Sequence, residues 1–62
     1  MSKFKLWLDN QSEINQKMVK KRLFEAGISK STFYRLLRTG EANESTKSLI
    51  SITLLTDKNE IF

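Results

Sequence analysis

Four side chains that can hydrogen-bond to a polyanion recur at helical spacing near the middle of the chain: Ser31, Tyr34, Arg35 and Arg38. At 3.6 residues per turn they share one face of a short helix. A guanidinium can donate two parallel hydrogen bonds to the edge of guanine, and a hydroxyl can pair with several bases. The spacing therefore predicts a helix that reads base edges in a DNA major groove through Lys30, Ser31, Tyr34 and Arg35.

Other polar and basic side chains, in this helix and on both sides of it, are expected to contact phosphate. Lysine side chains and the free N–H groups at a helix N-terminus bind phosphate oxygens, which positions a protein on DNA without specifying a sequence. The predicted phosphate contacts are Gln16, Lys17, Lys20, Lys21, Ser29, Arg38, Thr39, Asn43 and Lys47. The plainer alternative for both groups of residues is an ordinary solvated surface.

Two glycines delimit the basic helix. Gly27 can take the positive φ that ends a preceding helix, and Ser29 can cap the next helix through its side-chain oxygen. The predicted helix spans residues 29–38 and ends near Gly40, with Phe33, Leu36 and Leu37 on its apolar back. A glycine turn followed by a helix with a basic front and an apolar back is typical of a helix-turn-helix unit.

Hydrophobic spacing predicts further helices before and after this unit. They span residues 2–10, residues 15–26 with Asn15 as the cap, a segment capped by Asn43 or Ser45, and a last turn within residues 56–62. Their predicted apolar stripes are Phe4, Trp7 and Leu8, then Met18, Val19, Leu23 and Ala26, and finally Leu49, Ile52 and Leu55, widened by Ile50 and Leu54. Phe24 lies off the second stripe, and we expect it to join the core.

The C-terminal third has a second interpretation. Residues 48–54 alternate apolar and polar side chains and are rich in β-branched types, and residues 56–59 could form a turn. A β-hairpin from about residue 48 is therefore the alternative to the fourth helix.

Length and composition narrow the class of protein. The 62 residues predict one domain, residues 1–62, folded as an all-α bundle of four to five short helices. Because the chain has no Cys and no His, we expect no metal, no cofactor, no small-molecule ligand and no enzyme activity. No apolar run reaches membrane-spanning length, so we expect a cytoplasmic protein without a membrane partner.

The net charge of +4 is unevenly distributed. Residues 1–40 hold nine Lys and Arg against three acidic residues, whereas residues 41–62 hold two against four. The basic part contains the predicted helix-turn-helix unit, and a one-sided positive field attracts a polyanion. Double-stranded DNA is therefore the expected partner.

The chain resembles the helix-turn-helix domains of phage-repressor/Cro-type regulators. The resemblance is carried by residues 14–16, by Gly27–Leu37, and by residues 39–43 ahead of Leu49-Ile50-x-Ile52. In the register set by residues 15–16, it implies a second helix one turn longer than usual. That register buries Val19 and Leu23 and leaves Arg22 exposed.

The resemblance implies a sequence-specific transcriptional regulator in a bacterial or phage-infected cell, a repressor of phage, plasmid or mobile-element type. It also implies a homodimer that spans two half-sites about one helical turn apart. Ile61 and Phe62 are the candidate dimer contacts, with local packing as the alternative. The alternative functions are a DNA-bending or recombination accessory factor, and an antirepressor-like protein-interaction module on the same fold.

Overall fold

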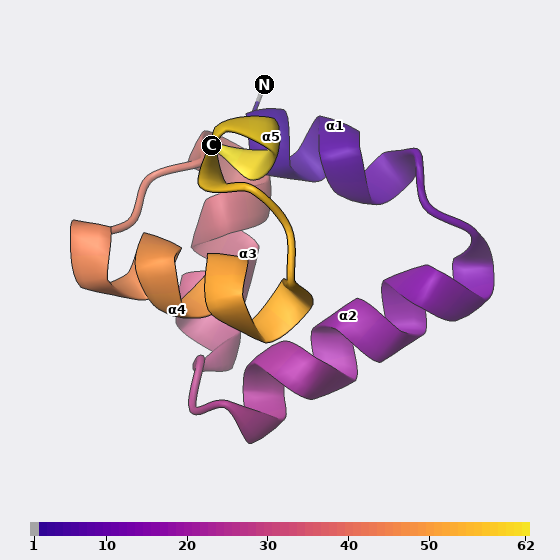
Figure 1. The fold of residues 1–62 in the computed structure, drawn as a ribbon, viewed down its shortest axis with the longest axis horizontal. Coiled ribbons are helices and arrows are strands. Elements are labelled where there is room, and N and C mark those ends of the chain that lie inside the picture. Colours follow the sequence, from indigo (N-terminus) through magenta and orange to yellow (C-terminus); the bar gives the residue numbers. More distant parts are fainter. Residues whose placement is uncertain (1) are drawn as a thin grey trace.

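The computed structural model describes residues 2–62, and all of their regular structure is helical (Figure 1). The helices are α1 (Lys3–Asp9), α2 (Glu13–Glu25), α3 (Lys30–Thr39), α4 (Glu44–Leu54) and α5 (Lys58–Ile61). The predicted all-α class is confirmed. The hairpin alternative is not adopted, because residues 48–62 form the end of α4 and the short α5.

Each helix begins after a side chain that accepts a hydrogen bond from a backbone N–H of the first turn, which satisfies a group that the helix itself leaves unpaired. These caps are Ser2, Ser12, Ser29, Asn43 and Asp57. The predicted caps Ser29 and Asn43 are confirmed. The predicted cap Asn15 is wrong, because Ser12 accepts from the N–H of Asn15 at 3.1 Å and the cap of α2 lies three residues earlier than expected.

One fully buried apolar side chain from each helix meets at the centre of the domain. These residues are Phe4, Leu23, Leu36, Ile50 and Ile61, all 0% exposed. Burying such side chains is the main source of stability in a chain this small. The arrangement explains why five short helices, none of which would be stable alone, form one domain.

Aromatic rings extend this core. The ring of Phe4 is stacked with Trp7 at 6.1 Å and with Phe62 at 6.0 Å between centroids, and it meets Phe33 edge-on at 6.2 Å. Phe24 packs edge-on against Phe33 at 5.5 Å. Phe24 therefore joins the core, as predicted, although its ring stays partly exposed.

The register predicted for α2 is correct, because Val19 and Leu23 are buried and Arg22 is exposed. Two other members of the predicted stripe are not buried: Met18 is 44% exposed, and Ala26 is half-buried. α2 therefore presents to the core a narrower stripe than its sequence indicates.

The predicted stripe of α4 is wrong for its three main members and right for the two residues that widen it. Leu49, Ile52 and Leu55 are exposed, and Ile50 is the residue that enters the core, with Leu54 packed beside it. α4 is apolar on two sides, and the side carrying Ile50 is the one that faces α2 and α5.

Ile61, one of the two candidate dimer contacts, is buried within the chain. α5 folds back beside α1 (Figure 1), which buries Ile61 completely and stacks Phe62 on Phe4. A side chain with no exposed surface offers nothing to a second subunit. The local-packing alternative therefore holds for Ile61, and Phe62 remains partly exposed.

Candidate nucleic-acid interface

The turn between α2 and α3 is a four-residue connection closed by the hydrogen bonds of a Schellman motif. The N–H of Ile28 donates to the carbonyl of Leu23 at 3.0 Å, and the N–H of Gly27 donates to Phe24 at 3.1 Å. Gly27 has φ of +101°, a conformation that side chains disfavour. Ile28 and Leu23 are both buried, which fixes the direction in which α3 leaves the turn.

α3 has the two faces that its sequence predicts. Phe33 and Leu36 are buried and Leu37 is partly buried. The predicted base-reading side chains, Lys30, Ser31, Tyr34 and Arg35, are all exposed, and so is Arg38. The helix begins at the cap Ser29, whose side-chain oxygen accepts from the N–H of Thr32 at 3.2 Å. α3 therefore offers an exposed polar and basic face on a firmly held back.

A hollow of about 320 Å³ lies between the start of α2 and α3, and it brings together Gln16, Lys17, Lys20 and Tyr34. Lys20 Nζ donates to the hydroxyl of Tyr34 at 3.3 Å and lies 5.6 Å from the centre of the Tyr34 ring. Gln16 Nε2 donates to the carbonyl of Gln11 at 3.1 Å. Lys21 is exposed and, with Lys17 and Lys20, lines a shallower hollow over Phe24.

A second hollow, of about 500 Å³, lies on the other side of α3, between this helix and the start of α4. Its lining includes Arg35, Asn43 and Lys47. Arg35 Nη2 lies 3.6 Å from a carboxylate oxygen of Glu41, and both side chains are mostly exposed. Such a surface ion pair contributes little to stability and leaves the guanidinium free to exchange partners. Thr39 Oγ1 donates to the carbonyl of Arg35 at 2.9 Å, so it is held against α3.

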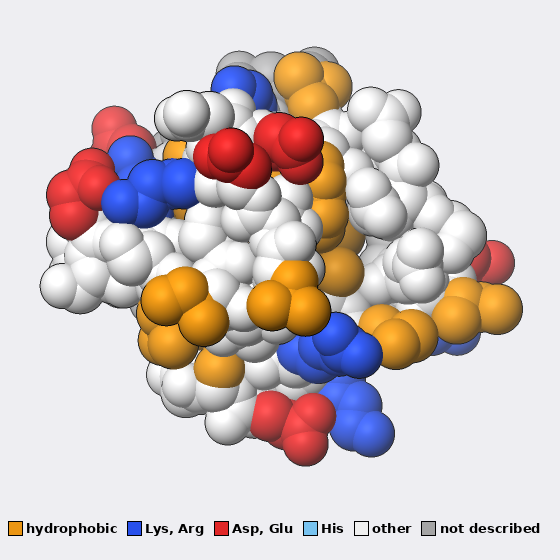
Figure 2. Space-filling model, in the orientation of Figure 1, with side chains coloured by type: hydrophobic (Ala, Val, Ile, Leu, Met, Phe, Trp, Pro, Cys, Tyr) orange, Lys and Arg blue, Asp and Glu red, His pale blue; other side chains and the backbone are white. Residues whose placement is uncertain are grey.

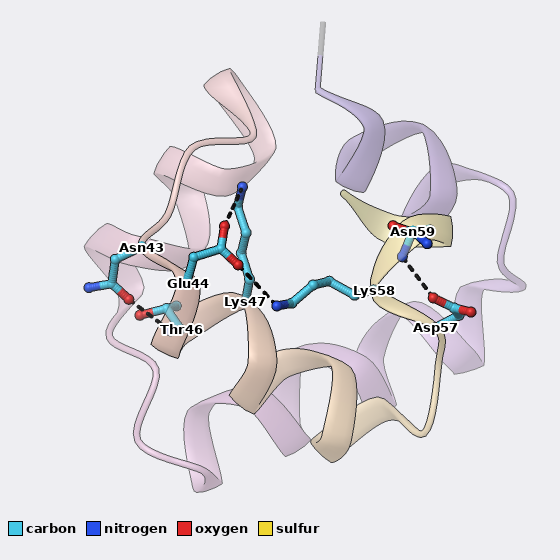
Figure 3. A network of polar contacts seen from close by, with 7 residues as sticks. All are labelled: Asn43, Glu44, Thr46, Lys47, Asp57, Lys58 and Asn59. Carbon is cyan, nitrogen blue, oxygen red and sulfur yellow. Dashed lines mark hydrogen bonds and ion pairs between the residues drawn. The ribbon is translucent and has the colours of Figure 1, made fainter.

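Lys47 belongs to a network of polar contacts at the start of α4 (Figure 3). Its Nζ lies 4.0 Å from one carboxylate oxygen of Glu44, and Lys58 Nζ donates to the other at 3.0 Å. The ammonium of Lys47 also lies 5.5 Å from the centre of the Phe62 ring. The hydrogen bond and the charge of Lys58, together with the charge of Lys47, hold the pKa of Glu44 below its ordinary value. Lys47 is thus partnered within the chain.

The two hollows beside α3 therefore bring together some of the predicted contacts: Gln16, Lys17, Lys20 and Tyr34 in one, and Arg35, Asn43 and Lys47 in the other. Sequence reasoning missed the internal partners: Tyr34 for Lys20, Glu41 for Arg35, and Glu44 for Lys47. Only the last had a visible signal, since Glu44 and Lys47 are three residues apart on one helix.

No protein-family model, curated protein or solved structure matches this chain. In the part of the chain that the structure describes, no cluster of three or more carboxylate side chains could hold a metal ion. The described helices also include none with the length and hydropathy needed to cross a membrane.

Proposed function

We propose that this chain binds double-stranded DNA in a sequence-specific manner and acts as a small transcriptional regulator, a repressor of phage, plasmid or mobile-element type. The observation that carries the proposal is the exposed face of α3, where Ser31, Tyr34 and Arg35 lie on a helix whose opposite face is buried. A helix held in this way by a capped turn fits the width of the DNA major groove.

The roles of individual residues follow from their chemistry. Arg35 suits the O6 and N7 edge of guanine, Ser31 can address several bases, and Tyr34 can contact a thymine methyl group or a phosphate. Lys30 lies at the start of the same helix, where no acidic side chain competes with a phosphate.

The surroundings of α3 support the same proposal. Lys17 and Lys21 are exposed on α2 and form no ion pair among residues 2–62, so their charge is available to a polyanion. Contacts of this kind attach a protein to any DNA sequence and weaken as salt rises.

The first experiment is selection of bound duplexes from a randomised DNA pool, followed by affinity measurements on the enriched site across salt concentrations. We expect one enriched sequence, bound much more tightly than random DNA and with a steep salt dependence. Binding that depends on salt but enriches no sequence would contradict specific readout and favour an architectural role. Absence of binding at low salt would exclude DNA as the partner.

Two variants then separate readout from attachment. Arg35→Ala should weaken binding to the selected site by about 1–3 kcal/mol and relax the preference at one base pair. Lys21→Ala should weaken binding to all sequences alike and reduce the salt slope by about one unit. Lys5→Ala, which removes the same charge from α1, is the matched control and should change neither quantity. An Arg35→Ala protein with unchanged preference would remove Arg35 from the readout.

A further inference from the structure

An apolar stripe on α4 faces solvent. Leu49 is 39% exposed, Ile52 is 71% exposed and Leu55 is 88% exposed, and they follow one another at three-residue spacing. Figure 2 shows orange apolar side chains in separate groups over α4 and along α2, with blue basic and white side chains between them. Apolar side chains this exposed that recur along one helix are candidates for an interaction surface.

Leu55 is the most unusual member of the stripe. α4 ends in the same Schellman pattern as α2, since the N–H of Thr56 donates to Ser51 at 3.1 Å and that of Leu55 donates to Ile52 at 3.2 Å. Leu55 thus occupies the position that Gly27 has after α2, and it has φ of 52° in the left-handed region. A leucine is disfavoured there, and its exposed side chain gains no burial in return within this chain.

A groove of about 210 Å³ lies next to Leu55. It is lined by the apolar side chains Trp7, Met18, Val19 and Leu54 and by the polar side chains Gln11, Asn15, Arg22 and Thr56. The two sequence neighbours of Leu55 therefore both line the groove. An apolar cavity of about 150 Å³ can hold a benzene molecule, so a groove of this volume has room for a leucine side chain.

Charges beside these two features are complementary. Arg22 lines the groove, and Asp57 follows Leu55 by two residues. Among residues 2–62, the ion pairs of the structure use other groups, so Arg22 and Asp57 have no charged partner. Leu55 therefore protrudes next to the acidic Asp57, and the groove contains the basic Arg22. Both features lie on the same side of the chain.

We propose that a second copy of this chain covers this surface in a two-fold dimer, with Leu55 of each copy in the groove of the other and Asp57 facing the other copy's Arg22. A two-fold contact uses one self-complementary patch twice, which is what the pairing of protrusion and groove provides. The groove includes none of the candidate DNA contacts. The proposal therefore stands without the proposed function, and it assigns a new location to the subunit contact expected at Ile61.

The small total surface of the chain limits the area that a contact between two copies can bury. A standard interface takes about 10% of the surface of a small protein, which is roughly 430 Å² of the 4259 Å² exposed here. Contacts of this size are at the weak end of specific interfaces. We therefore expect a dimer that forms reversibly as the protein concentration rises.

Sedimentation equilibrium of the whole chain, without DNA, tests the proposal over a range of protein concentrations. Wild type should change from monomer to dimer within the range. Leu55→Asn should raise the dissociation constant by at least about tenfold, while its unfolding midpoint stays the same or rises, because asparagine accepts the left-handed conformation more readily. The matched control is Leu6→Gln, which removes an exposed leucine of α1 outside the groove and should leave the dissociation constant unchanged.

A charge exchange tests the geometry. Arg22→Glu and Asp57→Lys should each weaken self-association, since each places like charges opposite one another, and an equimolar mixture should restore the dimer. Circular dichroism of each variant checks that the helices persist, because Asp57 also caps α5. A wild type that stays monomeric at every concentration would overturn the proposal. So would a dimer that neither Leu55→Asn nor the charge exchange affects.

Discussion

α3 and α4 are helices of similar length in the same small domain, but their sequences specify their orientation to different degrees. In α3 the apolar residues Phe33, Leu36 and Leu37 occupy a single face, and that face is the one turned inward. In α4 the apolar residues occupy two faces, and the inward one carries Ile50 whereas the outward one carries Ile52. A hydrophobic stripe therefore identifies the core side of a helix only when the helix has one such stripe.

The C-terminal ends of α3 and α4 also differ in how far contacts within the chain explain them. Both end in a left-handed residue, Gly40 after α3 and Leu55 after α4. Gly40 is favoured by the fold itself, because it has φ of +75° and a Cβ on it would lie in a tight contact, 3.0 Å from the Cβ of Ser2. Leu55 has no such packing reason within the chain, since its side chain is exposed. α3 is thus determined by contacts within the domain, while α4 carries features that these contacts do not explain.

The largest expected effect comes from two isoleucines of α4 that differ only in the face they occupy. Ile50→Ala should destabilise the domain by about 2–5 kcal/mol, because it removes a fully buried side chain and leaves a cavity. Ile52→Ala should change stability by no more than about 0.5 kcal/mol, because its side chain is 71% exposed. Chemical denaturation of both variants at a protein concentration low enough to keep them monomeric gives the two values.

The same two variants also test whether the two faces of α4 differ in burial. If Ile52→Ala were as destabilising as Ile50→Ala in the monomer, both faces of α4 would be covered within one chain. The exposed stripe would then not exist, and the inference drawn from it would fail.

A smaller effect is expected at the end of α3. Gly40→Ala should destabilise the domain by about 1–2 kcal/mol from the left-handed backbone alone, and the contact with Ser2 should add to this. Gly27→Ala, after α2, is the comparison, because a Cβ there would meet nothing within 4 Å and only the backbone cost of its φ of +101° remains. That φ lies further from the left-handed region of other residues than the φ of +75° at Gly40, so thermal denaturation should show a loss of stability in both variants. A loss in Gly40→Ala no larger than its backbone cost alone would show that the Ser2 contact yields without cost.

The features that could be predicted from the sequence are the local ones. The cap at Ser29, the turn at Gly27 and the end of α3 at Gly40 each depend on neighbouring residues in the chain, and the structure has all three. The α2 register was predictable for a similar reason, since Val19 and Leu23 are one helical turn apart. Whether α3 contacts DNA stays a prediction.

One feature that could not be predicted is local: Ser12 and Asn15 are equally good caps by type, and their local sequence does not choose between them. The others depend on segments far apart in the chain. Ile61 is buried because α5 returns to α1, a contact between the two ends of the domain. Likewise, the choice between Ile50 and Ile52 depends on where α2 and α5 lie. For these isoleucines tertiary packing, and not periodicity, decides the outcome.

The smallest expected effect distinguishes the starts of the two helices. The first turn of α4 carries the carboxylate of Glu44, whereas the first turn of α3 carries Lys30 and no acid. Lys58 and Lys47 lower the pKa of Glu44 from its ordinary value of 4.5, so the folded state binds this proton less readily than the unfolded state. The contribution of Glu44 to stability is therefore present above the unfolded pKa and is lost as the pH falls through the lower, folded pKa.

Lys58→Met should shift the pKa of Glu44 back toward 4.5, because it removes the hydrogen bond and the largest nearby charge. The titration of the Glu44 side-chain carboxyl carbon by NMR measures this directly. Lys30→Met, which removes a charge at the start of α3, is the control and should leave the pKa of Glu44 where it is. An unchanged pKa in Lys58→Met would show that Lys58 does not hold this carboxylate in solution. The start of α4 would then depend on its cap Asn43, as the start of α3 depends on Ser29.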